Sequence, residues 1–353
     1  MRAYTTACAL ACLAVAELGA EESCRPGEAV REEGFVEIGG IEQWVTLRGD
    51  DCANPALLMV HGGPGNPLSP FAESLYGAWE KDFTLVQWDQ RGAGRTYGRH
   101  EPSTELTVER YNATELTLEM LVRDGVEVAE YVRRRLGKER IVLTGASWGS
   151  ALGVSVVRAR PELFHAYVGV SQLVDYKRNL AASYARVAEI ARAKEDSAGV
   201  ALVDELGPPP WENPRNFGRL RRLIRVYEAE AAGPPAEMAR APAYDTPEIQ
   251  AAYYAGEELS FVKYVGLQGD GYANRVDLPA LGTKFSFPVY LVHGAEDLVT
   301  TPEVARAYYE RLAVPDKDFV LLPGVGHDTA APLVEAQFRL LTERVLPLVR
   351  AAE

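Results

Sequence analysis

The chain has 353 residues, of which 47% are hydrophobic and 25% are charged. This length allows one large α/β domain with an insertion, or two domains, and the composition is that of a folded protein rather than a disordered one. The 50 acidic and 37 basic side chains give a formal net charge of −13. This balance argues against nucleic-acid binding, which requires a basic face.

Residues 1–20 predict a signal peptide. Arg2 precedes an apolar run over residues 7–16, and small and acidic residues follow it. This order is typical of secretory leaders and predicts a secreted or periplasmic protein. A packed N-terminal helix in a cytoplasmic protein is the alternative. The apolar run is too short for a stable membrane span.

Four cysteines follow one another near the N-terminus: Cys8, Cys12, Cys24 and Cys52. Removal of the leader would leave two, an even number that suits an oxidising compartment. We therefore predict a disulfide between Cys24 and Cys52, with two unpaired cytosolic thiols as the alternative. The sequence has no CxxC pattern and no histidine cluster with metal-ligand spacing, so it predicts no metal site.

The next segments alternate between strand and helix patterns. Residues 34–51 predict a hairpin with its turn at Gly39-Gly40. Short apolar strands ending in turn residues are expected at 56–63, 83–92, 141–147, 166–172, 288–294 and 318–327. Helices are expected at 116–136, 148–159, 302–313 and 332–350. Strands that are apolar throughout belong in a covered parallel sheet, so the fold class is a doubly wound α/β sheet.

One segment interrupts this alternation. Residues 173–282 contain few strand-like runs and are rich in Ala, Arg, Glu and Tyr. Proline-rich breaks occur at 207–214 and 233–235. We interpret this segment as a helical insertion between two strands of one core, which is formed by residues 21–172 and 283–353.

The stretch "LTGASWGSALG" at 143–153 places Ser147 between an apolar strand and a helix. Gly145 and Gly149 complete the Gly-x-Ser-x-Gly pattern of a nucleophile elbow, in which small neighbours allow a sharp turn from strand to helix. A serine hydroxyl is a poor nucleophile at neutral pH. It needs a base within hydrogen-bond reach, and the base needs a carboxylate to orient it.

His327 is the predicted base among five histidines. It lies in "PGVGHDT", after the last predicted strand, where a loop can bring it over the carboxyl end of the sheet. The loop after the preceding strand offers Glu296 and Asp297, and Asp297 fits better because it stands where the chain turns toward a helix. Asp175 is a weaker candidate. The order Ser147, Asp297, His327 is that of the α/β-hydrolases.

Acyl transfer also needs N–H groups that bind a developing oxyanion. Trp148, directly after the serine, supplies one. The second is expected in "HGGPG" at 61–65, where glycines let the backbone approach a substrate. Gly63 is the preferred donor, and Gly62 is the alternative.

Five strings together resemble the proline iminopeptidase branch of the α/β-hydrolases: "HGGPG" (61–65), "WDQRGAGRT" (88–96), "GASWGS" (145–150), "HGAED" (293–297) and "GVGHD" (324–328). The resemblance implies a Ser-Asp-His serine hydrolase with a helical cap over 173–282, acting on small substrates. In that family, carboxylates of the cap bind the free α-amine of the substrate. Glu205, Glu228 and Glu258 are the counterparts offered here, although the aromatic and Asn-His parts of the family patterns are missing.

The sequence thus predicts a serine hydrolase that forms an acyl-enzyme and needs no cofactor. The predicted reaction is release of N-terminal proline, or another small residue, from short peptides. Hydrolysis of small esters or non-peptide amides is the alternative. A non-catalytic hydrolase-fold protein that binds a ligand or partner is a more remote one. The sequence predicts no oligomeric state.

Overall fold

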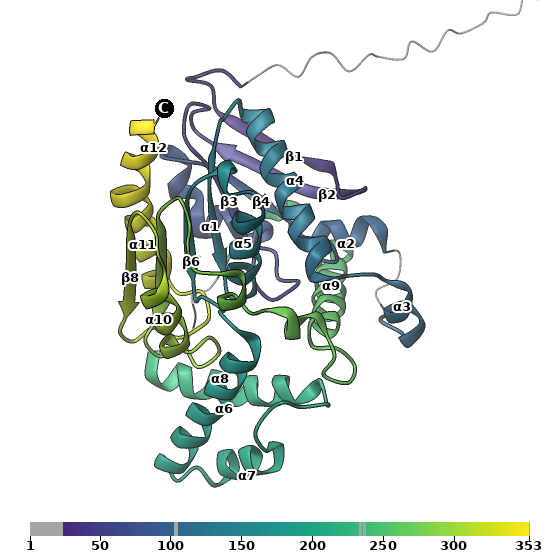
Figure 1. The fold of residues 1–353 in the computed structure, drawn as a ribbon. Coiled ribbons are helices and arrows are strands. Elements are labelled where there is room, and N and C mark those ends of the chain that lie inside the picture. Colours follow the sequence, from purple (N-terminus) through teal and green to yellow (C-terminus); the bar gives the residue numbers. More distant parts are fainter. Residues whose placement is uncertain (1–23, 102–104, 233–234, 236–237, 353) are drawn as a thin grey trace, which may run out of the picture.

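The protein is described by a computed structural model, which covers residues 24–101, 105–232, 235 and 238–352. The signal peptide predicted for residues 1–20 lies outside the described residues. Figure 1 shows a central sheet between two layers of helices, with a further group of helices at one end of the molecule.

The sheet has eight strands in the order β1-β2-β4-β3-β5-β6-β7-β8. β1 and β2 pair antiparallel, as do β2 and β4, and the remaining pairs are parallel. This arrangement confirms the predicted mostly parallel α/β sheet. The strands are β1 (Val30–Ile38), β2 (Ile41–Gly49), β3 (Ala56–Val60), β4 (Thr84–Trp88), β5 (Ile141–Ala146), β6 (Phe164–Val170), β7 (Val289–Gly294) and β8 (Lys317–Leu322).

Apolar side chains hold helices to both faces of the sheet. One buried cluster joins the strands to α4, α5 and α10, and a second joins them to α1, α11 and α12. The helices are α1 (Ala72–Tyr76), α2 (Gly94–His100), α3 (Val108–Ala113), α4 (Leu118–Leu136), α5 (Trp148–Ala159), α6 (Tyr176–Ala193), α7 (Ser197–Leu206), α8 (Arg215–Ala232), α9 (Pro247–Val265), α10 (Pro302–Arg311), α11 (Ala331–Leu340) and α12 (Leu346–Ala352).

Local sequence sets the ends of several of these elements. Thr117 caps α4, because its side chain accepts a hydrogen bond from the N–H of Met120. Gly137 ends the same helix in the left-handed conformation, with φ 65°. The helix predicted at 116–136 is thereby confirmed to within two residues.

Helices α6, α7, α8 and α9 all lie between β6 and β7 in the sequence. Figure 1 shows α6, α7 and α8 together at one end of the molecule, while α9 lies beside α2. The boundaries of a cap at 173–282 stay a prediction. Over the described ranges, no helix is both long and apolar enough to cross a membrane.

The N-terminal part of the described chain is tied to the sheet by a disulfide. Cys24 and Cys52 form this bond, with Cα atoms 5.8 Å apart. Cys52 lies between β2 and β3, near the amino end of β3. The disulfide therefore joins the segment before β1 to the loop that enters the parallel part of the sheet.

Candidate active site

Ser147 is the single residue between β5 and α5. Its backbone has φ 53° and ψ −123°, a left-handed φ that non-glycine residues rarely adopt. The turn is tight: a Cβ atom on Gly145 would lie 2.2 Å from the carbonyl oxygen of Gly149. A Cβ atom on Gly149 would lie 2.1 Å from the carbonyl oxygen of Val60. The two glycines of the Gly-x-Ser-x-Gly pattern are therefore sterically required.

The hydroxyl of Ser147 lies within hydrogen-bond distance of His327. Ser147 Oγ is 2.9 Å from His327 Nε2. On the other side of the ring, Nδ1 lies 3.0 Å and 2.9 Å from the two carboxylate oxygens of Asp297. A carboxylate only accepts hydrogen bonds, so Nδ1 carries the proton and Nε2 is free to accept the serine proton.

These three side chains follow β5, β7 and β8, and they meet at the carboxyl end of the parallel strands. In such sheets this edge is where ligands bind. The geometry is that of a nucleophile, a base and an orienting carboxylate in series, which can activate a hydroxyl for attack on a carbonyl.

Asp297 is buried and held by further hydrogen bonds. The N–H groups of Val299 and Thr300 donate to Oδ1 at 2.9 Å and 2.8 Å, and the Thr300 hydroxyl donates to Oδ2 at 2.8 Å. Burial acts to raise the pKa of Asp297, but the adjacent His327 outweighs it and holds this pKa well below its usual range. The carboxyl group is therefore ionised at neutral pH.

The contact with Asp297 also changes the pKa of His327. Burial acts to lower the pKa of His327, and the Asp297 carboxylate more than reverses this, so the pKa is raised above its usual value. An imidazole with a raised pKa is a stronger base. The side chain is also more readily protonated as the pH falls.

The other candidates for the acid, and another buried histidine, have different surroundings. Asp175 caps α6, where its carboxylate accepts from the N–H of Arg178 at 3.0 Å. Glu296 lines a separate, smaller cavity. His61 is buried and its Nε2 accepts from the N–H of Gln90 at 3.2 Å. Burial lowers the pKa of His61 to about 4, which keeps this ring neutral.

A cavity of about 820 Å³ opens above Ser147 and His327. Gly62, Gly63 and Pro64 form part of its lining. A Cβ atom on Gly62 would lie 3.3 Å from that of Ser147, so this glycine loop runs directly beside the serine. Trp148 is the first residue of α5, and its N–H therefore has no acceptor within the helix. Gly62 therefore lies beside Ser147, Gly63 lines the same cavity, and Trp148 directly follows the serine in the chain.

Helices α8 and α9 supply much of the rest of this cavity. Its aromatic lining includes Phe71, Tyr76, Phe217, Tyr253, Tyr254 and Phe261. Charged side chains also line it, namely Arg221, Arg222, Arg225, Glu257, Glu258 and Asp328. Apolar walls with a few charged groups are typical of small-molecule sites.

The three glutamates predicted to bind substrate have different surroundings. Glu258 lines the cavity. Glu205 is exposed and pairs with Arg219 at 2.6 Å, away from the cavity lining. Glu228 is buried, and its Oε1 accepts a hydrogen bond from the N–H of Leu298 at 2.8 Å. Sequence reasoning missed Glu257, which lines the cavity beside Glu258 and has the same residue type in the same helix.

Glu228 belongs to a set of contacts between α8 and the two loops that carry Asp297 and His327. Its hydrogen bond to Leu298 holds the first loop. Arg221, two turns earlier on α8, pairs with Asp328 in the second loop and lies 3.5 Å from Glu228. Burial raises the pKa of Glu228. The nearby His327 and Arg221 both act to lower it, but burial has the larger effect.

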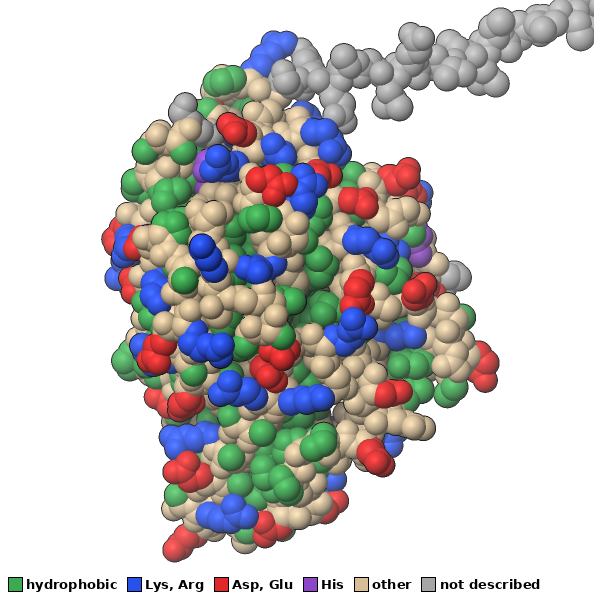
Figure 2. Space-filling view, viewed as in Figure 1, with side chains coloured by type: hydrophobic (Ala, Val, Ile, Leu, Met, Phe, Trp, Pro, Cys, Tyr) green, Lys and Arg blue, Asp and Glu red, His purple; other side chains and the backbone are tan. Residues whose placement is uncertain are grey.

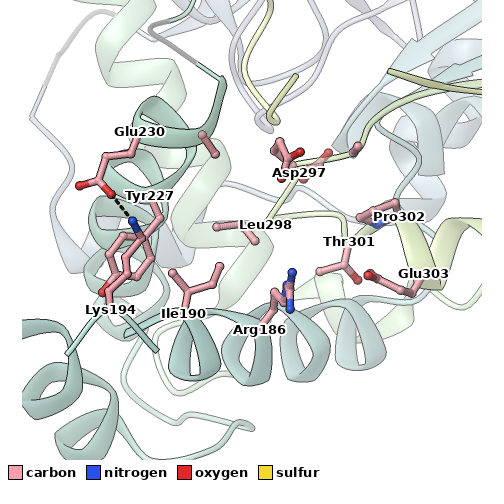
Figure 3. Close-up of a pocket in the computed structure, with 13 residues that line it drawn as sticks. Arg186, Ile190, Lys194, Tyr227, Glu230, Asp297, Leu298, Thr301, Pro302 and Glu303 are labelled. Atoms are coloured by element: carbon pink, nitrogen blue, oxygen red, sulfur yellow. Dashed lines mark hydrogen bonds and ion pairs between the residues drawn. The ribbon is translucent and has the colours of Figure 1, made fainter. Parts of the chain in front are cut away.

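A second cavity, of about 280 Å³, is lined by the Asp297 loop, by α6 and α8 and by the start of α10. Figure 3 shows Arg186 and Ile190 of α6 pointing toward Leu298 and the start of α10, and Lys194 beside Tyr227 and paired to Glu230. Ser147 and His327 do not line it, so the chemistry described above belongs to the larger cavity. In the part of the chain that the structure describes, no three His, Cys, Asp or Glu side chains are grouped to hold a metal ion.

The sequence model of one protein family, described as serine aminopeptidase, S33, matches residues 53–331. The chain belongs to this family. It is accordingly a hydrolase with the α/β-hydrolase fold, as predicted from its motifs.

Curated relatives of this S33 protein carry related names. It is 26% identical to "Probable aminopeptidase YbaC" of Bacillus subtilis, over 82% of this chain and 88% of the relative. It is 27% identical to "Probable proline iminopeptidase" of Streptomyces coelicolor, over 81% and 88% respectively.

Solved structures agree on the fold. The proline iminopeptidase of Mycobacterium smegmatis superposes with a TM-score of 0.59 at 17% identity, covering 91% of this chain and all of that one. The proline iminopeptidase-related protein TTHA1809 of Thermus thermophilus gives 0.57 at 21% identity, covering 90% and 99%.

Proposed function

We propose that this hydrolase is an aminopeptidase that works through an acyl-enzyme on Ser147. The observation that carries the proposal is the continuous hydrogen-bond chain from Ser147 Oγ through His327 to Asp297. The names of the curated relatives support peptide substrates with a free N-terminus. The carboxylates of Glu257 and Glu258, which line the cavity, are suited to bind an α-ammonium group.

In the first half of the reaction, Ser147 Oγ attacks the carbonyl carbon of the N-terminal residue while His327 Nε2 takes its proton. The negative charge that develops on the carbonyl oxygen is bound by the N–H groups of Gly63 and Trp148. Asp297 stabilises the imidazolium and keeps Nδ1 facing it. His327 then protonates the leaving amine, and the shortened peptide departs.

In the second half, water attacks the acyl-enzyme with His327 again as the base. The released products are the free N-terminal amino acid, such as proline or another small residue, and regenerated Ser147. Each proton goes to and returns from His327, so the reaction needs no cofactor.

We further propose that α6 to α9 act as a cap that sets substrate size. Two of these helices, α8 and α9, line the cavity above Ser147, which supports this role. The protein is also proposed to be exported, and the Cys24–Cys52 disulfide supports that, because such bonds persist mainly in oxidising compartments.

The variant Ser147→Ala tests the nucleophile. We expect loss of hydrolysis by about 10³-fold or more, loss of labelling by a fluorophosphonate probe, and an unchanged melting temperature. Ser150 lies three residues later, in the first turn of α5, and its hydroxyl donates to the backbone carbonyl of Ser147, so Ser150→Ala is the matched control that should keep its labelling. Labelling of the Ser147→Ala protein to the wild-type extent would refute the mechanism.

A substrate panel tests the aminopeptidase assignment. Aminoacyl arylamides with a free amine, their N-acetylated forms and short acyl esters are compared by kcat/KM. A strong preference for the free amine is expected. Equal rates on the N-acetylated forms would favour the esterase or amidase alternative, and labelling of Ser147 without any turnover would favour a binding protein.

A further inference from the structure

The active-site cavity has charges of opposite sign on two different helices. Arg221, Arg222 and Arg225 line it from α8, and Glu257 and Glu258 line it from α9. Their contacts show which of these charges are already neutralised within the protein and which remain for a ligand.

Arg221 is neutralised. Its side chain is 13% exposed and contacts the carboxylates of Asp328 and Glu228. Arg225 is 66% exposed, and its closest acidic contact is Asp328 Oδ2, at 3.7 Å from Nε. Arg222 forms no ion pair within 4.0 Å with any residue that the structure describes. Arg221 and Arg225 therefore share Asp328, and Arg222 has no acidic partner among the described residues, so the α8 side keeps an excess of positive charge.

The α9 carboxylates are available as well. Among the described residues, neither Glu257 nor Glu258 takes part in an ion pair or a side-chain hydrogen bond. Glu257 lies next to the glycine loop, since a Cβ atom on Gly65 would be 2.8 Å from the Cα of Glu257. This places the backbone of α9 at Glu257 against the glycine loop, whose residue Gly62 lies beside Ser147.

The arginines border the side of the leaving group. His327 gives its proton to the departing amine, so the departing peptide must lie on the His327 side of the scissile bond. Asp328 directly follows His327, and Arg225 lies 3.7 Å from it. A negative charge carried by the leaving peptide would therefore approach the α8 guanidinium groups.

An independent observation indicates that the cavity takes a polar ligand. Ser171, at the carboxyl end of β6, lines the cavity, is 2% exposed and has a left-handed φ of 46°. Its hydroxyl is buried and has no hydrogen-bond partner among the residues that the structure describes. A buried polar atom without a partner is costly, and a bound ligand with a polar group would satisfy it.

We propose that the substrates are short peptides of two or three residues that carry both a free amine and a free C-terminal carboxylate. Glu257 and Glu258 face the ammonium group, and Arg222 and Arg225 bind the carboxylate of the leaving part. This inference rests on the proposed aminopeptidase function. An extended residue spans at most about 3.5 Å, so each added residue moves the carboxylate further from these arginines.

The test compares dipeptides and tripeptides that end in a free carboxylate with the same peptides ending in a carboxamide. In the wild-type enzyme, kcat/KM is expected to be about 10- to 100-fold higher for the free acid, mainly through KM, because a charge-assisted contact is lost in the amide. In R222Q/R225Q this ratio should fall toward one. R219Q is the matched control, because Arg219 lies on the same helix and pairs with Glu205 outside the cavity.

Aminoacyl arylamides, which have no carboxylate, distinguish the possible failures. Equal rates on acid and amide peptides by an enzyme that cleaves arylamides would overturn this inference and leave the aminopeptidase function standing. An unchanged acid-to-amide ratio in R222Q/R225Q, with a wild-type melting temperature, would also overturn it. No cleavage of any substrate with a free amine would overturn both proposals.

Discussion

The proposed role of Asp297 requires that both of its side-chain oxygens accept hydrogen bonds. Both of its oxygens accept hydrogen bonds, from Val299, Thr300 and His327. An asparagine has nearly the same shape, but one of its terminal groups can only donate. That group would oppose the donors around it and would favour the wrong tautomer of His327.

We therefore expect Asp297→Asn to lower kcat by about 10³- to 10⁴-fold while the protein stays folded. Single-turnover kinetics with an arylamide and a thermal melt check this. Glu296→Gln is the matched control, because Glu296 lies outside the larger cavity. A kcat within about threefold of wild type in Asp297→Asn would mean that this carboxylate does not orient the base.

The pH dependence of the wild-type enzyme follows from His327. The base must be unprotonated, and the carboxylate of Asp297 raises its pKa above the usual 6.5. The acidic limb of kcat/KM should therefore have its midpoint above 6.5, with activity lost as the pH falls through it. A midpoint well below 6.5 would contradict the pairing.

At this scale the sequence predicted Ser147, Asp297 and His327 because each follows a recognisable strand and turn. It did not predict the surroundings of Glu228, whose partner Leu298 is 70 residues away in the sequence. Contacts of that kind depend on how two elements pack, and no local pattern records them.

Among the elements, α8 has the most direct connection to the chemistry. Through Glu228 it accepts from the N–H of Leu298, next to Asp297, and through Arg221 it pairs with Asp328, next to His327. One helix of the insertion thus contacts the loops that carry the acid and the base. Its position should influence the distance between them.

Two substitutions at Glu228 separate charge from hydrogen bonding. Glu228→Ala leaves the buried N–H of Leu298 without its acceptor and should cost about 1–3 kcal/mol in unfolding free energy. Glu228→Gln keeps an acceptor and should cost less. Urea denaturation measures both, and equal losses would show that the hydrogen bond contributes little.

The same pair of variants should move the pH profile. The negative charge of Glu228 helps to raise the pKa of His327, so its removal should lower that pKa and shift the acidic limb of kcat/KM to lower pH. A shift of the acidic limb in both variants would show that the negative charge of Glu228 acts on His327. An unmoved limb in both would argue that Glu228 acts only on the fold.

The order of the strands and of the longer core helices could be predicted because apolar strands alternate with amphipathic helices bounded by Gly and Pro. The short helices α1, α2 and α3 were not predicted. The insertion was harder to interpret. Amphipathic patterning indicates which face of α8 is apolar, but not that its charged residues meet the Asp297 and His327 loops. That outcome depends on where the helix packs against the core.

On the scale of the whole molecule, acidic and basic side chains are interspersed on the face that Figure 2 shows. The net charge of −13 is therefore spread rather than gathered into one field on this face. The charges that matter for the proposed substrate are the few inside the cavity, and overall charge gave no indication of them.

The Cys24–Cys52 disulfide should contribute to global stability. It closes a loop with a sequence separation of 28 residues, for which chain entropy predicts about 3–4 kcal/mol. A Cys24→Ser, Cys52→Ser double variant should lose stability by roughly this amount in urea denaturation. Mass spectrometry with and without reductant checks the bond, and two free thiols in exported protein would refute it.

Cys52 stands near the amino end of the strand β3, whereas Ser147 stands at the carboxyl end of its neighbour β5. The disulfide and the proposed nucleophile therefore lie at opposite ends of the parallel strands. A reducing environment should shorten the working lifetime of the enzyme at elevated temperature and leave its initial velocity in the cold almost untouched.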